Sequence, residues 1–77
     1  MASKLFVGSL NPDFGLVELI ALFKPFGEIL EADVFVDPNT GRSRCFGFVT
    51  IASHKDAKTA VHALDGTMQL GSRIHVE

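Results

Sequence analysis

The sequence has few of the residues on which several classes of small protein depend. It contains one cysteine, so it can form no intramolecular disulfide and has no Cys-x-x-Cys pair. Only 7 of its 77 residues are lysine or arginine, and its net charge is −2. A protein that binds nucleic acid mainly through charge is usually basic. The composition therefore counts against a protein that holds a polyanion mainly through charge.

Segments for membrane insertion and secretion are also lacking. No apolar run reaches the roughly 20 residues that a membrane-spanning helix needs. The N-terminus lacks the charged start and long apolar stretch of a signal peptide. Because a lone cysteine also fits a reducing compartment, we expect an intracellular protein, nuclear or cytoplasmic, without membrane association.

Catalytic and metal-binding patterns are not found either. The three histidines, His54, His62 and His75, do not have the spacing of metal ligands. No nucleophile–base pair or phosphate-cradling glycine loop stands out. We therefore expect no catalytic residue, no metal and no cofactor.

The most informative stretch is residues 44–51, Arg-Cys-Phe-Gly-Phe-Val-Thr-Ile. As a β-strand, it would place alternate side chains on opposite faces. One face is small and aliphatic and suits packing against helices. The other carries Phe46 and Phe48 with Arg44 beside them. The chain must either cover this aromatic face or leave it open for a ligand.

Period-two alternation predicts further strands at residues 4–8, 28–36 and 73–77. In residues 28–36, Phe35 falls on the same side as the acidic residues Glu31 and Asp33. Phe35 could therefore lie on an open face or pack as an edge residue against its neighbour. The two carboxylates would repel phosphate groups, so this strand is a poor path for an anionic ligand. We also expect a loop at residues 37–43 and a short extra strand or turn at residues 68–69.

Two helices are predicted from apolar residues at helical spacing. The first repeats such residues from Leu19 to Phe26, with Asp13 as the expected N-cap and Pro25 and Gly27 at its end. Its phenylalanines are expected in the core.

The second helix follows Ser53, which forms a capping-box pattern with Asp56. The resulting order of strand, helix, strand, strand, helix, strand is the split βαβ pattern of ferredoxin-like α+β folds. Two helices of roughly 11 residues each can cover one face of a four-stranded antiparallel sheet, but not both. We therefore expect one domain, residues 1–77 with a core of about 4–77, and one uncovered sheet face.

Residues 44–51 resemble the ribonucleoprotein octamer of RNA recognition motif (RRM) domains: basic, Gly, aromatic, small, Phe, Val, any residue, aromatic. Five of the seven specified positions match. Cys45 stands where Gly is usual, and Ile51 where an aromatic residue is usual. Both fall on the aliphatic face, where we expect Cys45 to be buried. Residues 5–10, Leu-Phe-Val-Gly-Ser-Leu, resemble the family's hexamer, with Ser9 in place of Asn.

The resemblance implies that residues 4–8 and 44–51 are neighbouring central strands. Phe6, Phe46 and Phe48 would then form one cluster on the open face. It further implies that this cluster stacks the bases or a ribose of single-stranded RNA, while Arg44 pairs with a phosphate. The second-rank RNA contacts would be Lys4, Arg42, Phe35, Arg73 and His75.

Other interpretations stay open. A terminal segment, a second copy or a partner protein could cover the phenylalanines, as in some RRM-like domains, and single-stranded DNA is another possible ligand. Arg42 could be a solvated loop charge, and His75 a solvated edge residue. We expect a monomer that binds roughly 2–4 nucleotides with micromolar affinity. RNA processing, decay, translation and transport are all compatible with such a post-transcriptional role.

Overall fold

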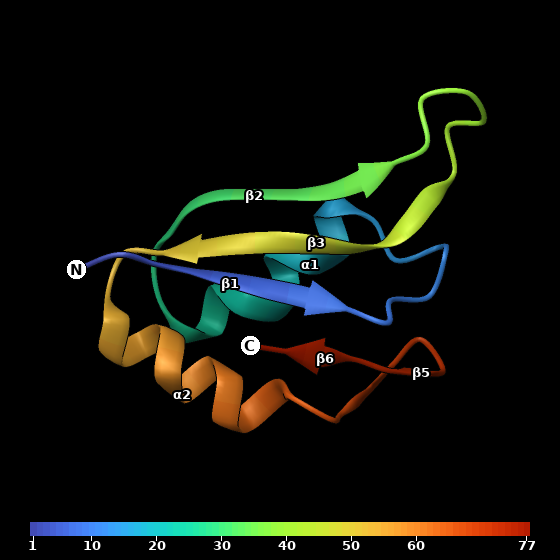
Figure 1. Ribbon diagram of the computed structural model, residues 1–77. Helices are drawn as coiled ribbons and strands as arrows, with labels where there is room; N and C mark the ends of the chain where they lie inside the picture. The colour runs from blue at the N-terminus through green and yellow to red at the C-terminus, as the bar shows by residue number, and fades with distance from the viewer.

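A computed structural model describes all 77 residues and confirms the predicted order of elements. The main sheet is antiparallel and consists of four strands, β1 (Ser3–Gly8), β2 (Ile29–Val36), β3 (Ser43–Ile51) and β6 (His75–Val76). The helical elements are α1 (Leu16–Phe23), the short 3-10 helix η1 (Lys24–Phe26) and α2 (His54–Leu64). A small hairpin of two strands, β4 (Met68–Gln69) and β5 (Ser72–Arg73), precedes β6 (Figure 1).

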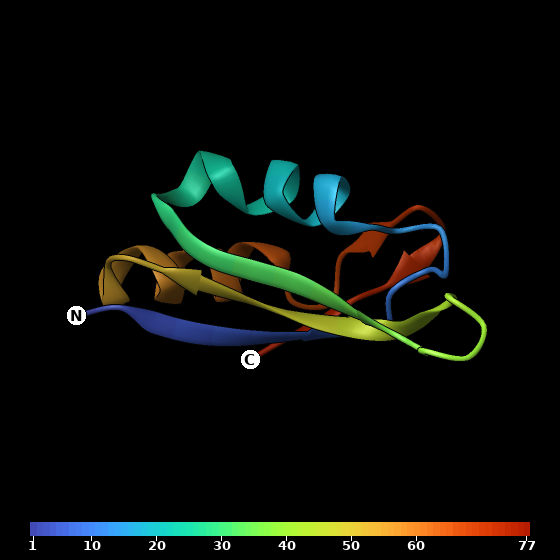
Figure 2. The ribbon, with the colours of Figure 1, turned by 90° about the horizontal axis from the view of Figure 1, so that it is seen from above.

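The strand order is β2-β3-β1-β6, so β1 and β3 are the central pair, as the resemblance to RRM domains implies. Their register places Phe6 opposite Phe48 and Leu5 opposite Val49. Both helices lie on the same side of the sheet, and no element covers the other side (Figure 2). The fold is therefore the expected two-layer ferredoxin-like arrangement with one open sheet face.

The core fills the space between the sheet and the helices. Val49 and Ile51 of β3 are fully buried, together with Leu19 and Phe23 of α1. Each such side chain contributes about 1.5–3 kcal/mol through removal of apolar surface from water. α2 faces the sheet with Ala57, Ala60 and Leu64, and the two alanines let it approach closely. Neither helix is long and apolar enough to span a bilayer.

The start of α1 differs from the prediction, because the N-cap is Gly15 rather than Asp13. The amide of Asp13 donates to Asn11 Oδ1 at 2.7 Å, which holds residues 11–13 in a side-chain-closed turn. Phe14 is buried directly after this turn, so the helix begins beyond it. The Gly15 amide then donates to Glu18 Oε1 at 2.7 Å. By contrast, α2 begins as predicted, with Ser53 Oγ accepting from the Asp56 amide.

The last strand is also shorter than the predicted 73–77. Arg73 pairs with Met68 in the β4–β5 hairpin, outside the main sheet. The backbone of Ile74 then bonds to Gly66 and Thr67, which follow α2. Only from His75 onward does the chain pair with β1. Period-two alternation continues through this change of partner, so the pattern alone could not reveal it.

Gly47 is buried in β3, where it pairs with Val7 on one side and Val34 on the other. A Cβ atom here would overlap the carbonyl oxygen of Asp33 and lie 3.0 Å from Val34 Cα. Because both atoms belong to the backbone, the strands would have to move apart. We expect Gly47→Ala to lower the free energy of unfolding by about 1–3 kcal/mol, measured by urea denaturation with circular dichroism.

The matched control for this substitution is Gly15→Ala. Its added methyl group would meet only the end of the flexible Glu18 side chain, at 3.1 Å. We expect a smaller loss for Gly15→Ala than for Gly47→Ala. Equal losses would contradict the close strand approach at Gly47.

Candidate nucleic-acid interface

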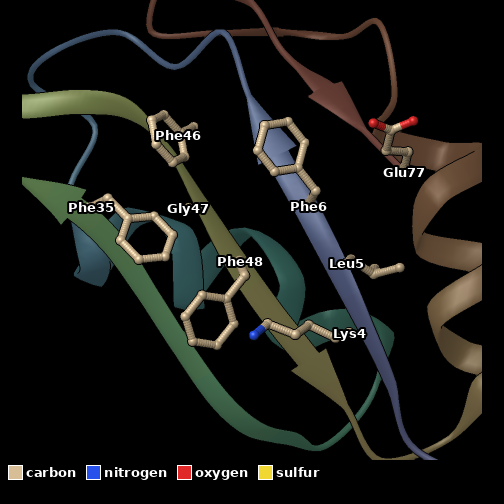
Figure 3. A pocket seen from close by; sticks show the side chains of 8 residues that line it. All are labelled: Lys4, Leu5, Phe6, Phe35, Phe46, Gly47, Phe48 and Glu77. Carbon is tan, nitrogen blue, oxygen red and sulfur yellow. The ribbon is translucent and has the colours of Figure 1, made fainter.

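Four phenylalanines lie together on the open sheet face, around a hollow of about 400 Å³ (Figure 3). Phe6 comes from β1, Phe35 from β2, and Phe46 and Phe48 from β3. The remaining residues that line the hollow are Lys4, Leu5, Gly47 and Glu77. The structure thus brings together the three phenylalanines that the sequence singles out and places Phe35 with them.

The four rings form a connected chain. Ring centroids are 6.0 Å apart for Phe6 and Phe46, 5.2 Å for Phe35 and Phe46, and 5.9 Å for Phe35 and Phe48. All three pairs are tilted rather than stacked face to face. Phe6 and Phe35 each remain 42% exposed. A contiguous exposed aromatic group of this kind on a small domain marks an interaction site.

Strand register and a glycine explain how this face is built. Phe6 and Phe48 are directly opposed in the β1–β3 pair, and Phe46 lies two residues away on the same face. The Phe6 ring leans over Gly8, where an added Cβ would lie 2.7 Å from the Phe6 Cε2 atom. Gly8 therefore makes room for the ring beside the sheet.

A bulge separates Arg44 from the aromatic cluster. The β2–β3 register shifts between Val34 and Val36. On β3, Cys45 has a φ of 66°, in the left-handed region that favours glycine. Cys45 is only half-buried rather than buried as predicted, but it still packs against the core. Val36 is also exposed next to this shift, although the alternation along residues 28–36 predicts that its side chain points toward the core.

The cationic residues that the sequence analysis predicts as RNA contacts lie in different parts of the structure. Lys4 Nζ lies 4.2 Å from the centroid of the Phe48 ring (Figure 3). Arg42, Arg44 and Arg73 are exposed, but none of them lines the hollow. Arg42 lies in the β2–β3 loop, whereas Arg73 belongs to the small hairpin. Lys4 is therefore the only cation at the aromatic cluster itself.

His75 lies at the outer edge of the sheet, on β6. Its Nδ1 is 3.2 Å from Asp65 Oδ1, and its Nε2 is 3.5 Å from Glu77 Oε2. Asp65 also accepts a hydrogen bond from the Val76 amide at 2.9 Å. Two carboxylates thus flank the exposed imidazole.

Carboxylates flank the aromatic cluster on both sides. On the β2 side, Asp33 is the register partner of Phe48. On the β6 side, Glu77 exchanges two backbone hydrogen bonds with Phe6, at 2.8 and 3.0 Å, and lines the hollow. Sequence analysis missed Glu77 as a lining residue, because that role depends on how the last residues pair with β1. The open face is therefore aromatic in the middle and acidic at its edges.

The chain belongs to the RNA recognition motif family, which it matches over residues 5–75. The RNA-binding protein BRN2 of Arabidopsis thaliana is 39% identical over 75 residues, which cover 97% of this chain and 18% of that protein. The second RRM domain of the yeast poly(U)-binding protein Pub1 is 35% identical, with a TM-score of 0.88 over 96% of this chain and 89% of that one. A Sxl-lethal protein/RNA complex is 26% identical, with a TM-score of 0.91 over 96% of this chain and 46% of that one.

The left-handed backbone at Cys45 leads to a stability prediction. A β-branched side chain is strained at positive φ, so we expect Cys45→Val to lower the free energy of unfolding by about 1–3 kcal/mol. Cys45→Gly is the control, because it removes the strain and loses only a half-buried thiol. It should be at least as stable as the wild type in the same denaturation experiment. Equal stability of the two variants would contradict the left-handed conformation.

Proposed function

We propose that the chain binds single-stranded RNA across its open sheet face, with bases stacked on the phenylalanines. The observation that carries this proposal is the cluster of four phenylalanines on a face that no element covers. Every base has a π-face, so such a surface accepts successive bases with little sequence preference. Membership of the RRM family and the likeness to a protein/RNA complex support RNA as the ligand.

Stacking supplies most of the binding energy in this proposal. Each base stacked on an aromatic side chain contributes about 1–3 kcal/mol. Stacks on Phe6, Phe46 and Phe48 therefore give roughly 3–9 kcal/mol before the costs of association are subtracted. Micromolar affinity needs about 8 kcal/mol, which only the upper part of this range reaches. We propose micromolar affinity for a segment of about 2–4 nucleotides, with stacking in that upper part of the range.

The charges on the face favour a particular backbone path. Glu31 and Asp33 on β2 and Glu77 beside β6 repel phosphates from both edges of the sheet. The RNA backbone is therefore proposed to follow the two central strands. Arg42 and Arg44, near the β2–β3 loop, would contact phosphates that leave the hollow at that end. Arg73 and His75 lie outside the hollow and are proposed as peripheral contacts only.

The proposal also covers the size of the RNA-binding module and the kind of protein that contains it. The chain spans only 18% of the length of the BRN2 protein. We propose that residues 4–77 act as one monomeric, non-catalytic module of an intracellular protein with a post-transcriptional role. Binding of a partner protein to the same face, or of single-stranded DNA, is the alternative that the experiments below separate from RNA binding.

The first functional prediction concerns the two β3 phenylalanines. Phe46→Ala together with Phe48→Ala should weaken RNA binding by at least about 30-fold, because two stacking surfaces are lost. Fluorescence anisotropy with short random-sequence RNA pools measures this change, and an NMR spectrum establishes that the variant remains folded. The same pools made of deoxyribonucleotides show whether the 2′-hydroxyl matters.

A matched control removes apolar surface from the helix layer. Leu16→Ala together with Val17→Ala truncates two exposed side chains of α1, on the opposite side of the sheet. This variant should bind RNA as the wild type does. Unchanged RNA affinity of a folded Phe46→Ala, Phe48→Ala variant would refute the proposal and direct attention to protein partners.

The second functional prediction concerns Phe35, which extends the cluster onto β2. Its ring is as exposed as that of Phe6 and contacts both Phe46 and Phe48. Phe35→Ala should weaken RNA binding by about 5- to 100-fold if a base stacks on it. The dependence of the Kd on salt should not change, because no cation is removed. Unaltered affinity would mean that Phe35 packs against Phe46 and Phe48 but stacks no base.

A further inference from the structure

Lys4 contacts the aromatic cluster through its ammonium group. Its ammonium nitrogen lies 4.2 Å from the centroid of the Phe48 ring, and Figure 3 shows the side chain reaching toward that ring. The only salt bridges in the structure join His75 to Asp65 and Glu77, so Lys4 has no carboxylate partner. The one cation of the hollow is therefore held by an aromatic ring rather than by an opposite charge.

The strand register explains this contact. Lys4 is the partner of Thr50, and Phe6 is the partner of Phe48, so Lys4 and Phe48 are diagonal neighbours on one face. Phe35 lies on another side of the Phe48 ring, with a centroid distance of 5.9 Å. In the free protein, the Phe48 ring thus has Lys4 and Phe35 as neighbours on two different sides.

A base cannot occupy the space above Phe48 that the ammonium fills. An exposed cation–π contact is weaker than the stack of a base on an aromatic ring, so a base can displace the cation. A displaced ammonium beside a stacked nucleotide lies close to that nucleotide's phosphate. Three carboxylates face the same side of the sheet: Glu31 and Asp33 on β2, two strands away from Lys4, and Glu77, which lines the hollow. None of them forms a salt bridge with Lys4.

We propose that Lys4 is an exchangeable cover of Phe48: a base displaces its ammonium from the ring, and the ammonium then pairs with a phosphate of the bound RNA. This inference rests on the proposed RNA-binding function and assigns the phosphate contact at the cluster to Lys4 rather than to Arg44. Lys4 would both protect the ring in the free protein and supply the single ionic contact at the centre of the face.

The test compares two variants that lose the same charge. Lys4→Met keeps an unbranched side chain over Phe48 but removes the ammonium. Lys58→Met is the control, because Lys58 is exposed on α2, in the opposite layer. Affinity for the tightest-binding short RNA is measured for both variants and the wild type at several salt concentrations.

Loss of one phosphate contact to a single strand should reduce the slope of log Kd against log salt by about 0.7. We expect this reduction, and affinity about three- to tenfold weaker at low salt, for Lys4→Met but not for Lys58→Met. Equal slopes for the two variants would overturn the proposal. Tighter binding by Lys4→Met would also overturn it, because Lys4 would then only obstruct the ring.

NMR of the Lys4 ε-methylene protons follows the displacement directly. In the free protein these protons should be shifted upfield by the Phe48 ring current, and Phe48→Leu should abolish that shift. Saturation with RNA should move them toward ordinary lysine values. An unchanged upfield position in the complex would overturn the exchange while leaving RNA binding intact. If the wild type binds none of the RNA pools, the proposed function fails and this inference fails with it.

Discussion

The antiparallel pairing of β1 with β3 is the constraint on which the interface depends. It sets Phe6 opposite Phe48 and at the same time places Leu5 and Val7 over the core. A slip of one residue would exchange the two faces, burying the phenylalanines and exposing the aliphatic side chains. The large energy of core burial therefore fixes the position of the aromatic rings. Gly47 contributes by allowing β2 and β3 to approach closely at the centre of the sheet.

Local periodicity was sufficient to predict the first three strands of the main sheet, the two helices and the open face. It also predicted the shared face of Phe6, Phe46 and Phe48, once the resemblance to RRM domains supplied the strand order. The start of the last strand was not predictable in this way, because it depends on the segments with which residues 73–77 pair. Nor was the start of α1. The turn that displaces the start of α1 from Asp13 depends on a side-chain hydrogen bond and on the burial of Phe14.

One prediction about β3 was wrong, because Cys45 is only half-buried. Regular alternation places Cys45 in the core and Arg44 beside Phe46, but the left-handed backbone at Cys45 interrupts it. The glycine that is usual at this position of the RRM octamer fits this backbone conformation. The cysteine in its place must therefore adopt a conformation that favours glycine. A substitution that looks like a change of core packing is instead a change at a bulge. The backbone angle at Cys45 is a feature that no side-chain pattern encodes.

The acidic edges of the face and its single central cation have a common consequence for recognition. Long-range attraction of a polyanion is weak when the protein has a net charge of −2. Nonspecific binding of nucleic acid, which arises mainly from phosphate contacts, is correspondingly low. In the proposed mode of binding, a ligand gains affinity chiefly by presenting unpaired bases to the rings, which a duplex with stacked bases cannot do. Scarcity of cations thus favours single strands over duplexes, because the charge contact that both could make is small and the stacking contact belongs to single strands alone.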